Sequence, residues 1–221
     1  IVNSNDFNKE MRKTFGIKSH TIYNPINKNE IWKLSNYKKK IKFFEKKTIN
    51  LISVGRLVKQ KNQIEILSAL VELKNSIKNF RLLILGYGPE KKNLQRFIND
   101  NNLKKIVKIN FVKNPYKFMK MSDVFVLSSK YEGLPNVLQE AAYLNKYIIS
   151  SNCKTGPREI LNKYKFGELY KVGDIKGLIS KLKKLSKKKL SLNKKKYSEN
   201  LDDFNYKKNL EQYLIAVKKL I

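Results

Sequence analysis

Short apolar runs alternate with longer amphipathic stretches along most of the chain from residue 50 onward. Each run is almost continuously apolar and rich in β-branched residues, as expected of strands that are buried on both faces. The six predicted strands are Leu51–Val54, Arg81–Leu85, Val107–Phe111, Val124–Leu127, Tyr147–Ser150 and Gly167–Tyr170. Because alternating strands and helices are typical of repeated βα units, we predict a doubly wound α/β domain with helices on both faces of a parallel sheet.

The amphipathic stretches have readable starts. Asn62 followed by Glu65 resembles a capping box and predicts a helix that reaches about Lys78. Pro89 suits the first position of a helix over Glu90–Asn101. Further helices are predicted at Tyr116–Met121, Val137–Asn145 and Ile175–Leu185, with a short one after Gly156-Pro157.

The two ends of the chain do not follow this alternation. Residues 1–26 predict a short helix over Asp6–Phe15 and then an extended segment, Thr21–Pro25, held open by its proline. Tyr197–Ile221 has the pattern of one long helix after a lysine-rich spacer. Both ends therefore look like connectors to another part of a protein.

Composition narrows the class of protein. A chain of 221 residues holds one main domain, and its charged fraction of 30% and mean hydropathy of −0.52 indicate a water-soluble protein. The single cysteine, Cys153, cannot form an internal disulfide, which favours a cytoplasmic location. With His20 as the only histidine, histidine-based metal sites and Ser-His triads are excluded.

The net charge of +30 changes the picture less than its size suggests. Such charge usually indicates nucleic acid or an anionic membrane as the partner. Here the excess is lysine, with only five arginines, and it is spread along the chain, so nucleic acid is not expected. The Lys-Leu stretch Lys181–Lys189 could lie on anionic lipid, which predicts peripheral contact with the cytoplasmic membrane face.

The turn after the first strand carries candidate anion ligands. In open parallel sheets, ligands bind beyond the carboxyl ends of the strands. This turn lacks both G-x-G-x-x-G and G-x-x-x-x-G-K-[ST], so it has neither the dinucleotide fingerprint nor a P-loop. It does offer Arg56 and Lys61, a planar fork and a point charge, which suit a diphosphate.

The turn after the fourth strand carries two carboxylates. Pro135 disfavours helix at the residue before it, so Glu132 should lie on the loop and Glu140 in the following helix. The free amides at the start of that helix can hold an anion. The chain has no D-x-D sequence, the usual carboxylate pair for a divalent ion on a nucleotide diphosphate, and we therefore predict a metal-independent site.

These motifs, in this order, resemble the carboxyl-terminal domain of the retaining glycosyltransferases of family 4. The matching segments are Val54–Leu57 with Lys61-Asn62, Leu85–Pro89, Ser122–Ser129, Glu132–Glu140 and Cys153–Leu161. Members of that family have the two-domain GT-B fold, of which this chain would be one Rossmann-like half. The motif variants are similar to those of enzymes that build bacterial surface polysaccharides and lipid-linked glycans.

The resemblance implies a role for each candidate residue. Glu132 would be the catalytic residue, near the anomeric carbon of the transferred sugar, and Glu140 would bind the ribose. The donor diphosphate would be held by Arg56, Lys61, Gly133, Leu134, Asn136 and Val137, and the base would be flanked by Val112 and Lys113. The implied co-substrate is a UDP- or GDP-sugar and the acceptor a glycan or lipid-linked glycan, with no metal or other cofactor.

The resemblance also divides the chain. Residues 1–26 would be the tail of an amino-terminal acceptor domain with its linker, residues 27–195 the nucleotide-sugar-binding domain, and residues 196–221 a helix that crosses back. This half alone is expected to bind donor weakly and to transfer little. Two alternatives stay open: a basic module that binds nucleic acid or a membrane surface, and a GT-B epimerase or phosphorylase.

Overall fold

The fold is built on a six-stranded parallel sheet. The computed structural model describes residues 1–36, 42–45, 47–74, 79–164, 167–188 and 201–218. The strands are β1 Ile49–Val54, β2 Phe80–Leu85, β3 Val107–Asn110, β4 Val124–Leu127, β5 Tyr147–Ser151 and β6 Gly167–Tyr170. Every predicted strand is confirmed to within two residues at each end, because a continuous apolar run is a strong signal for a strand buried on both faces.

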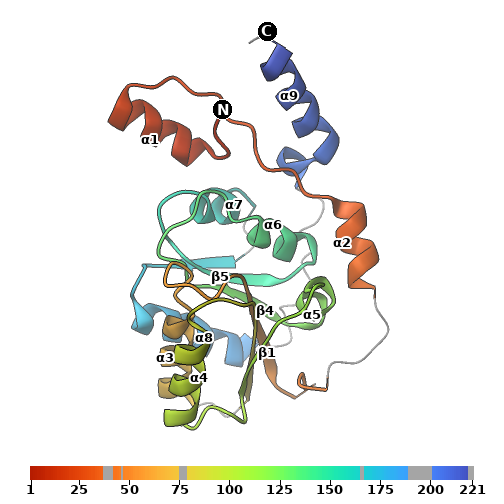
Figure 1. Cartoon of the computed structure of the whole chain (residues 1–221). Coiled ribbons are helices and arrows are strands. Elements are labelled where there is room, and N and C mark those ends of the chain that lie inside the picture. Colours follow the sequence, from red (N-terminus) through yellow and green to blue (C-terminus); the bar gives the residue numbers. More distant parts are fainter. Residues whose placement is uncertain (37–41, 46, 75–78, 165–166, 189–200, 219–221) are drawn as a thin grey trace.

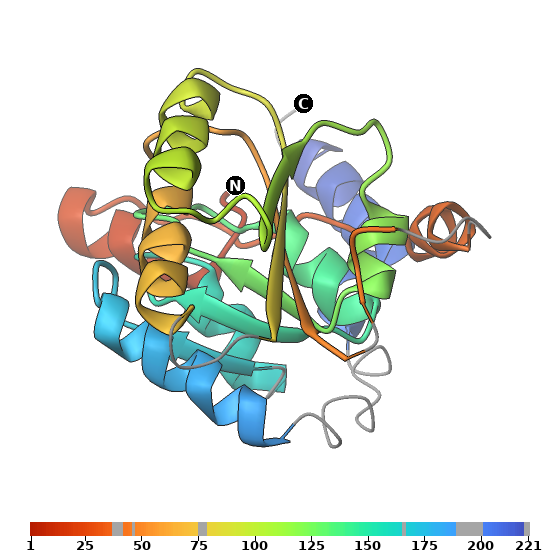
Figure 2. The same ribbon diagram turned by 90° about the horizontal axis from the view of Figure 1, so that it is seen from below.

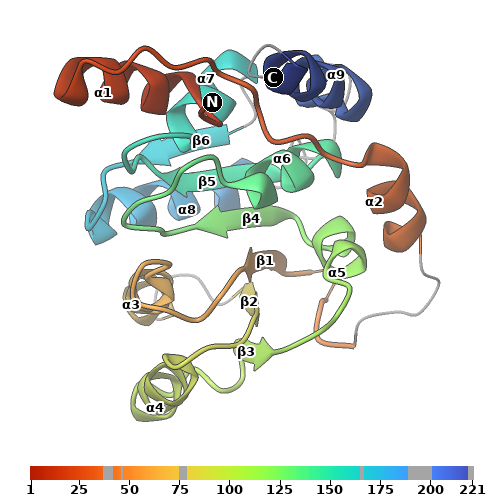
Figure 3. The same ribbon diagram turned by 45° about the horizontal axis from the view of Figure 1, so that its top comes forward.

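The strand order places a switch point in the middle of the sheet. The order is β3-β2-β1-β4-β5-β6, and all five strand pairs are parallel. The chain therefore winds outward from β1 in one direction and from β4 in the other (Figure 3). In sheets of this kind, ligands bind outside the carboxyl ends of the strands at the point where the strand order reverses. The predicted doubly wound α/β fold is confirmed.

Helices cover both faces of the sheet. They are α1 Asn5–Phe15, α2 Lys28–Ser35, α3 Gln63–Leu73, α4 Lys91–Asp100, α5 Tyr116–Met121, α6 Asn136–Tyr143, α7 Pro157–Tyr164, α8 Ile175–Lys188 and α9 Tyr206–Lys218, with a 3-10 turn at Asp202–Phe204. One layer consists of α3, α4 and α8, shown in orange, yellow-green and blue in Figure 2. The other contains α5, α6 and α7, while α1 and α9 lie beyond it (Figure 1).

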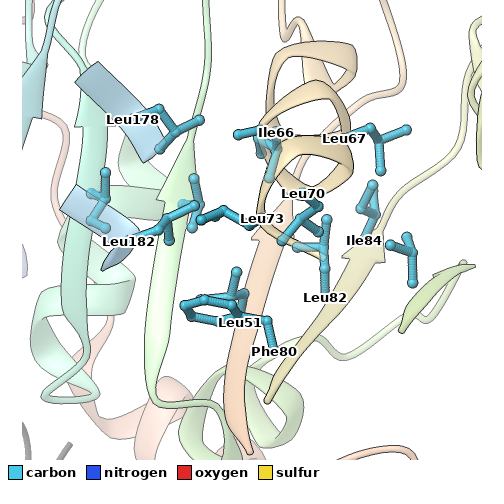
Figure 4. Close-up of a cluster of buried hydrophobic side chains, with 14 of the residues drawn as sticks. Leu51, Ile66, Leu67, Leu70, Leu73, Phe80, Leu82, Ile84, Leu178 and Leu182 are labelled. Carbon is cyan, nitrogen blue, oxygen red and sulfur yellow. The ribbon is translucent and has the colours of Figure 1, made fainter. Parts of the chain in front are cut away.

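The packing of α8 against α3 corrects the prediction that the Lys181–Lys189 stretch lies on anionic lipid. In Figure 4, Leu178 and Leu182 of α8 face the helix that carries Leu70 and Leu73. Leu182 and Leu185 are almost fully buried, and burying each leucine contributes about 2 kcal/mol. The apolar side of the Lys181–Lys189 stretch is therefore part of the core and is not available to lipid; Lys189 itself lies outside the described residues. In the described part of the chain, no helix is long and apolar enough to cross a membrane.

The helix boundaries differ from prediction in several places. The capping box is wrong: Asn62 lies at φ 50° in the left-handed region and its side chain bonds to the Glu65 carboxylate instead of a backbone amide. Helix α3 ends at Leu73, and residues 75–78 lie outside the described chain. Pro89 precedes α4 in a turn.

Helix α2 and the 3-10 turn before α9 have no counterpart in the predictions. Helix α2 was not predicted, because a short apolar pattern such as that of Ile31 gives little signal. The predicted terminal helix is shorter than expected, since α9 begins at Tyr206 after the 3-10 turn. Residues 197–200 and 219–221 of that prediction lie outside the described residues.

Candidate functional site

The loops that follow β1 and β4 are joined across the switch point of the sheet. The backbone amide of Lys130 donates to the carbonyl of Gln60 at 2.8 Å, and the Gln60 side chain donates to the carbonyl of Tyr131 at 2.8 Å. Ser128 donates its hydroxyl to the carbonyl of Lys61 at 2.9 Å. These three bonds make the two loops one wall, so the residues that they carry are held in a fixed relation.

Glu132 meets Lys61 at this wall. Nζ of Lys61 lies 2.6 Å from Oε1 of Glu132, and the hydroxyl of Ser129 donates to the same oxygen at 2.5 Å. The Glu132 side chain is only 8% exposed and that of Lys61 16%. Removing one member of such a pair leaves a desolvated charge. The other oxygen of Glu132, Oε2, has no hydrogen-bond partner among the described residues, so it can accept a bond from a ligand hydroxyl.

Arg56 lies on the same loop as Lys61 but is not drawn into the pair. Arg56 is exposed, and its backbone carbonyl accepts a hydrogen bond from the side-chain amide of Gln63 at 2.9 Å. Its guanidinium forms no hydrogen bond or ion pair with any residue that the structure describes. Arg56 therefore has all its donors free for an anion, whereas Lys61 would share its charge between Glu132 and a ligand.

The turn between the two glutamates ends in an uncapped helix start. Gly133 and Asn136 are exposed, Leu134 is buried, and Val137 is partly buried. Pro135, at the N-cap of α6, makes no capping bond from its side chain. The amides of Asn136 and Val137, the first two of α6, make no hydrogen bond to the described residues, whereas that of Leu138 donates to the carbonyl of Pro135 at 2.9 Å. Two amides at the helix start can therefore face an anion.

A residue from the amino-terminal segment before α2 also reaches this turn. The side chain of Asn24 donates to Oδ1 of Asn136 at 2.9 Å. This bond links the amino-terminal segment directly to the start of α6, although the two residues are 112 positions apart in the chain.

Glu140 lies on α6 against α5. The hydroxyl of Tyr116 donates to Oε1 of Glu140 at 3.3 Å. Burial raises the pKa of the Glu140 carboxyl, and the bond from Tyr116 only partly opposes this. Burial, followed by the Glu140 charge, raises the pKa of Tyr116 to about 12. Tyr116 begins α5 just after the exposed Lys113 and the partly buried Val112, so Glu140 borders the predicted base-flanking loop.

Several residues at this site were not predicted. Ser129 and Tyr116 each contact one of the two glutamates, and the hydroxyl of Thr155 donates to the carbonyl of Glu132. Tyr87 and Phe111 are large, exposed aromatic residues that meet edge to face, with ring centroids 5.3 Å apart, at the ends of β2 and β3. An aromatic residue in a strand-exit turn was the one available signal for Tyr87 and Phe111.

Two glycines at strand exits are required by the packing of the turns against each other. A Cβ on Gly86 would lie 1.9 Å from the carbonyl oxygen of Gly55, and one on Gly156 would lie 2.5 Å from that of Gly133. Gly156 also has φ +89°, which side chains rarely adopt. These two glycines therefore let two pairs of loops touch, those after β1 and β2 and those after β4 and β5.

Known proteins share both the sequence and the fold of the chain. Residues 35–208 match the family model described as glycosyl transferases group 1. An uncharacterized glycosyltransferase of Methanocaldococcus jannaschii, MJ1059, is 39% identical over 152 residues, which are 67% of this chain and 37% of the relative. A relative in Campylobacter jejuni, N-acetylgalactosamine-N,N'-diacetylbacillosaminyl-diphospho-undecaprenol 4-alpha-N-acetylgalactosaminyltransferase, is 35% identical over 134 residues, 60% of this chain and 36% of the relative.

A solved structure agrees at the level of the fold. Anabaena HepE, in complex with UDP and glucose, superposes with a TM-score of 0.83 at 17% identity and covers 99% of this chain and 62% of its own. The chain spans less than two-fifths of the length of the two sequence relatives. Because the family model covers well over half of the chain, the chain belongs to the group 1 glycosyltransferases.

Proposed function

We propose that this chain is the donor-binding half of a retaining, metal-independent glycosyltransferase. The enzyme would move a hexosyl or related sugar from a UDP- or GDP-sugar to a glycan or lipid-linked acceptor. The observation that carries the proposal is the Lys61–Glu132 pair at the switch point, which leaves one oxygen of Glu132 free for a sugar hydroxyl. The loop that carries Lys61 also carries Arg56, whose guanidinium is unpaired among the described residues. The carboxyl ends of the two central strands are where such folds bind nucleotides.

Each side chain has a role that its surroundings support. Arg56, exposed and unpaired among the described residues, would take the donor diphosphate together with Lys61. The turn Gly133, Leu134, Asn136 and Val137 would add backbone amides to the same phosphates. Glu132 would hold the sugar near its anomeric carbon.

The nucleoside would lie on the other side of the diphosphate. Glu140 would accept bonds from the ribose hydroxyls, and Val112 and Lys113 would flank the base. The exposed aromatic rings of Tyr87 and Phe111 are near the same strand ends and could border it. No step in this arrangement requires a metal ion, since cations and helix amides face the departing charge.

The reaction exchanges one bond at the anomeric carbon for another. The bond from that carbon to the donor phosphate oxygen breaks while the acceptor hydroxyl oxygen forms its bond on the same face. The hydroxyl proton passes to the departing diphosphate. Arg56, Lys61 and the start of α6 would stabilise the negative charge that develops on the leaving group.

The second half of the enzyme would cover the two terminal helices. The domain proposal is unchanged: residues 1–26 belong to the tail of the acceptor domain and its linker, residues 27–195 to the donor domain, and residues 196–221 to a returning helix. Its support is that α1 and α9 expose apolar side chains, including Phe7, Phe15, Leu210 and Leu214. The boundary at residue 195 lies outside the described residues.

Calorimetry on this chain with UDP and GDP tests the proposal. We expect Arg56→Ala to weaken binding by roughly 1.5–3 kcal/mol, the range for a hydrogen bond to a charged group. Arg96→Ala is the matched control, because Arg96 is an exposed arginine on α4. Binding of neither nucleotide, or an equal loss in both variants, would contradict the assignment.

A further inference from the structure

A cavity of about 470 Å³ lies between α1 and the loop that follows β5. Helix α1 contributes Lys9 and Lys13 to its lining, and the loop and the start of α7 contribute Lys154, Thr155 and Arg158. Thr155 also contacts the donor site, through the backbone carbonyl of Glu132, but none of the four cations has a role in the donor site described above. The cavity is therefore a separate candidate for a ligand.

The lining of this cavity carries an excess of positive charge. Besides its four cations it has two carboxylates, Asp6 and Glu10, and Glu10 is already paired with Lys154 at 2.6 Å. Lys9 and Lys13 are exposed and form no ion pair with the described residues. A concave surface with unpaired cations attracts anions more strongly than a flat one, because low-dielectric walls focus the field.

The arginine in the lining narrows the class of anion. Nε of Arg158 donates to Oδ1 of Asn152 at 3.2 Å, which orients the guanidinium, and its two terminal nitrogens make no hydrogen bond to the described residues. A planar fork combined with lysine point charges suits a phosphoryl group. A phosphate monoester carries close to two negative charges at neutral pH, which matches the excess of two cations in the lining.

Helix α1 is fixed against the domain, so the cavity has defined walls. The carboxylate of Glu159 on α7 accepts bonds from the backbone amides of Asn5 at 3.0 Å and of Asp6 at 3.3 Å. The backbone amide of Phe7 donates to the hydroxyl oxygen of Ser4 at 3.1 Å, and this bond caps the start of the helix. A carboxylate at a helix start is favoured both by the free amides and by the helix dipole.

The cavity adjoins the loop that carries Glu132. Thr155, in its lining, donates its hydroxyl to the backbone carbonyl of Glu132, and Lys154 forms a parallel bridge with Tyr131. An acceptor that reaches the donor sugar at Glu132 from this side would pass over the cavity.

We propose that the cavity binds a phosphoryl group carried by the acceptor. This inference rests on the proposed function, because it takes Glu132 as the point of sugar transfer. The phosphoryl group can come from a prenyl diphosphate that anchors a lipid-linked glycan or from a phosphate in solution, and the two sources share the same recognition chemistry.

Calorimetry on this chain with the donor site saturated by UDP tests the proposal. The probes are geranyl diphosphate, as a soluble prenyl diphosphate, and inorganic phosphate. We expect the double variant Lys9→Gln/Lys13→Gln to weaken binding of geranyl diphosphate by about tenfold or more, as expected when hydrogen bonds to charged groups are lost. The control is Lys92→Gln/Arg96→Gln, an exposed pair with the same spacing on α4, which should bind as the parent does.

The outcomes separate this inference from the donor assignment. The proposal is overturned if the parent and Lys9→Gln/Lys13→Gln bind geranyl diphosphate with equal affinity. It is also overturned if the α4 control loses as much affinity as the α1 variant. Tighter binding of geranyl diphosphate than of phosphate supports a prenyl diphosphate as the source, whereas equal affinity supports the phosphoryl group alone. If UDP does not bind but the α1 variant still loses the diphosphate probe, the donor assignment fails and the cavity stands.

A second variant covers the possibility that the α1 substitutions disturb the fold. Circular dichroism checks that each protein is folded, and Arg158→Gln should give a loss of affinity similar to that of the α1 variant. With the UDP concentration raised to saturate its weakened donor site, Arg56→Ala should leave the affinity for geranyl diphosphate unchanged, since Arg56 is not in the cavity lining. A loss in Arg56→Ala as large as in Arg158→Gln would place the probe in the donor site and overturn the proposal.

Discussion

Two glutamates eight residues apart are desolvated in different ways. Glu132 has a cation, Lys61, and a hydroxyl on one of its oxygens. Among the residues that the structure describes, Glu140 has only the hydroxyl of Tyr116 as a partner, and burial raises the pKa of the Glu140 carboxyl. The ionised form of Glu140 therefore lowers the stability of the folded protein. Such perturbed groups are common at ligand-binding sites.

The cost at Glu140 should depend on pH. A carboxyl whose pKa is raised on folding destabilises the fold as pH rises through its unfolded and then its folded pKa, and the full penalty persists above both. We expect Glu140→Gln to raise the free energy of unfolding at pH 7 but not at pH 4. UDP affinity should fall by about tenfold, the effect of one hydrogen bond to a charged group.

Urea unfolding at the two pH values, with calorimetry for UDP, measures both effects. Glu211→Gln on the exposed surface of α9 serves as the control and should change stability by less than about 0.5 kcal/mol. A destabilised Glu140→Gln at pH 7 would show that the Tyr116 bond outweighs the cost of burial.

At the scale of elements, the site depends on turns that touch. The loop after β5 presses Gly156 against Gly133, and Thr155 binds the carbonyl of Glu132. The loop after β1 is tied to the loop after β4 by Gln60. Three strand exits therefore position one carboxylate, and a change in any of them should reach it.

A pair of glycine substitutions separates this contact from backbone strain. Gly156 and Gly173 have φ +89° and +79°, but a Cβ on Gly173 would meet nothing within 4 Å. Alanine at either position should cost about 1–2 kcal/mol of stability for the left-handed conformation. Only Gly156→Ala should cost a further 1–3 kcal/mol or so for overpacking and weaken nucleotide binding. Unfolding and calorimetry of both variants check this, and equal effects would rule out a role for the contact with Gly133.

At the scale of the whole molecule, charge and apolar surface point to different partners. The net charge of +30 is dispersed, and the leucines of α8 that suggested a membrane contact are in the core. Family membership, not charge, therefore decides against a module that merely coats nucleic acid or lipid. Among the described residues, half of the large exposed apolar side chains lie on α1 and α9, beyond the layer of α5, α6 and α7 (Figure 1).

This surface should make the chain associate with itself at high concentration. On α9, Leu210, Leu214 and Val217 recur at helical spacing and are 45%, 54% and 48% exposed. We expect Leu210→Ser/Leu214→Ser to reduce association in sedimentation velocity without loss of folding, because these side chains are not in the core. Met121→Ser, an exposed apolar residue on α5, should leave association unchanged. A parent chain that stays monomeric at high concentration would refute the idea.

Most strands and helices, and the local positions of the two glutamates, could be predicted from the sequence. Strands such as Val124–Leu127 were readable because both faces are buried, and Pro135 placed Glu132 on a loop and Glu140 on a helix. The unusual conformation of Asn62 was not readable, because a capping pattern and a left-handed turn use the same residue types.

Tertiary structure alone decided which of these residues meet. Lys61 and Glu132 are 71 positions apart, and only the adjacency of β1 and β4 brings their loops together. The contact of Asn24 with Asn136 and the basic cavity under α1 likewise depend on where a distant segment docks. Local propensity acts over a few residues, whereas strand order and docking are set by the burial of surfaces that lie far apart in the chain.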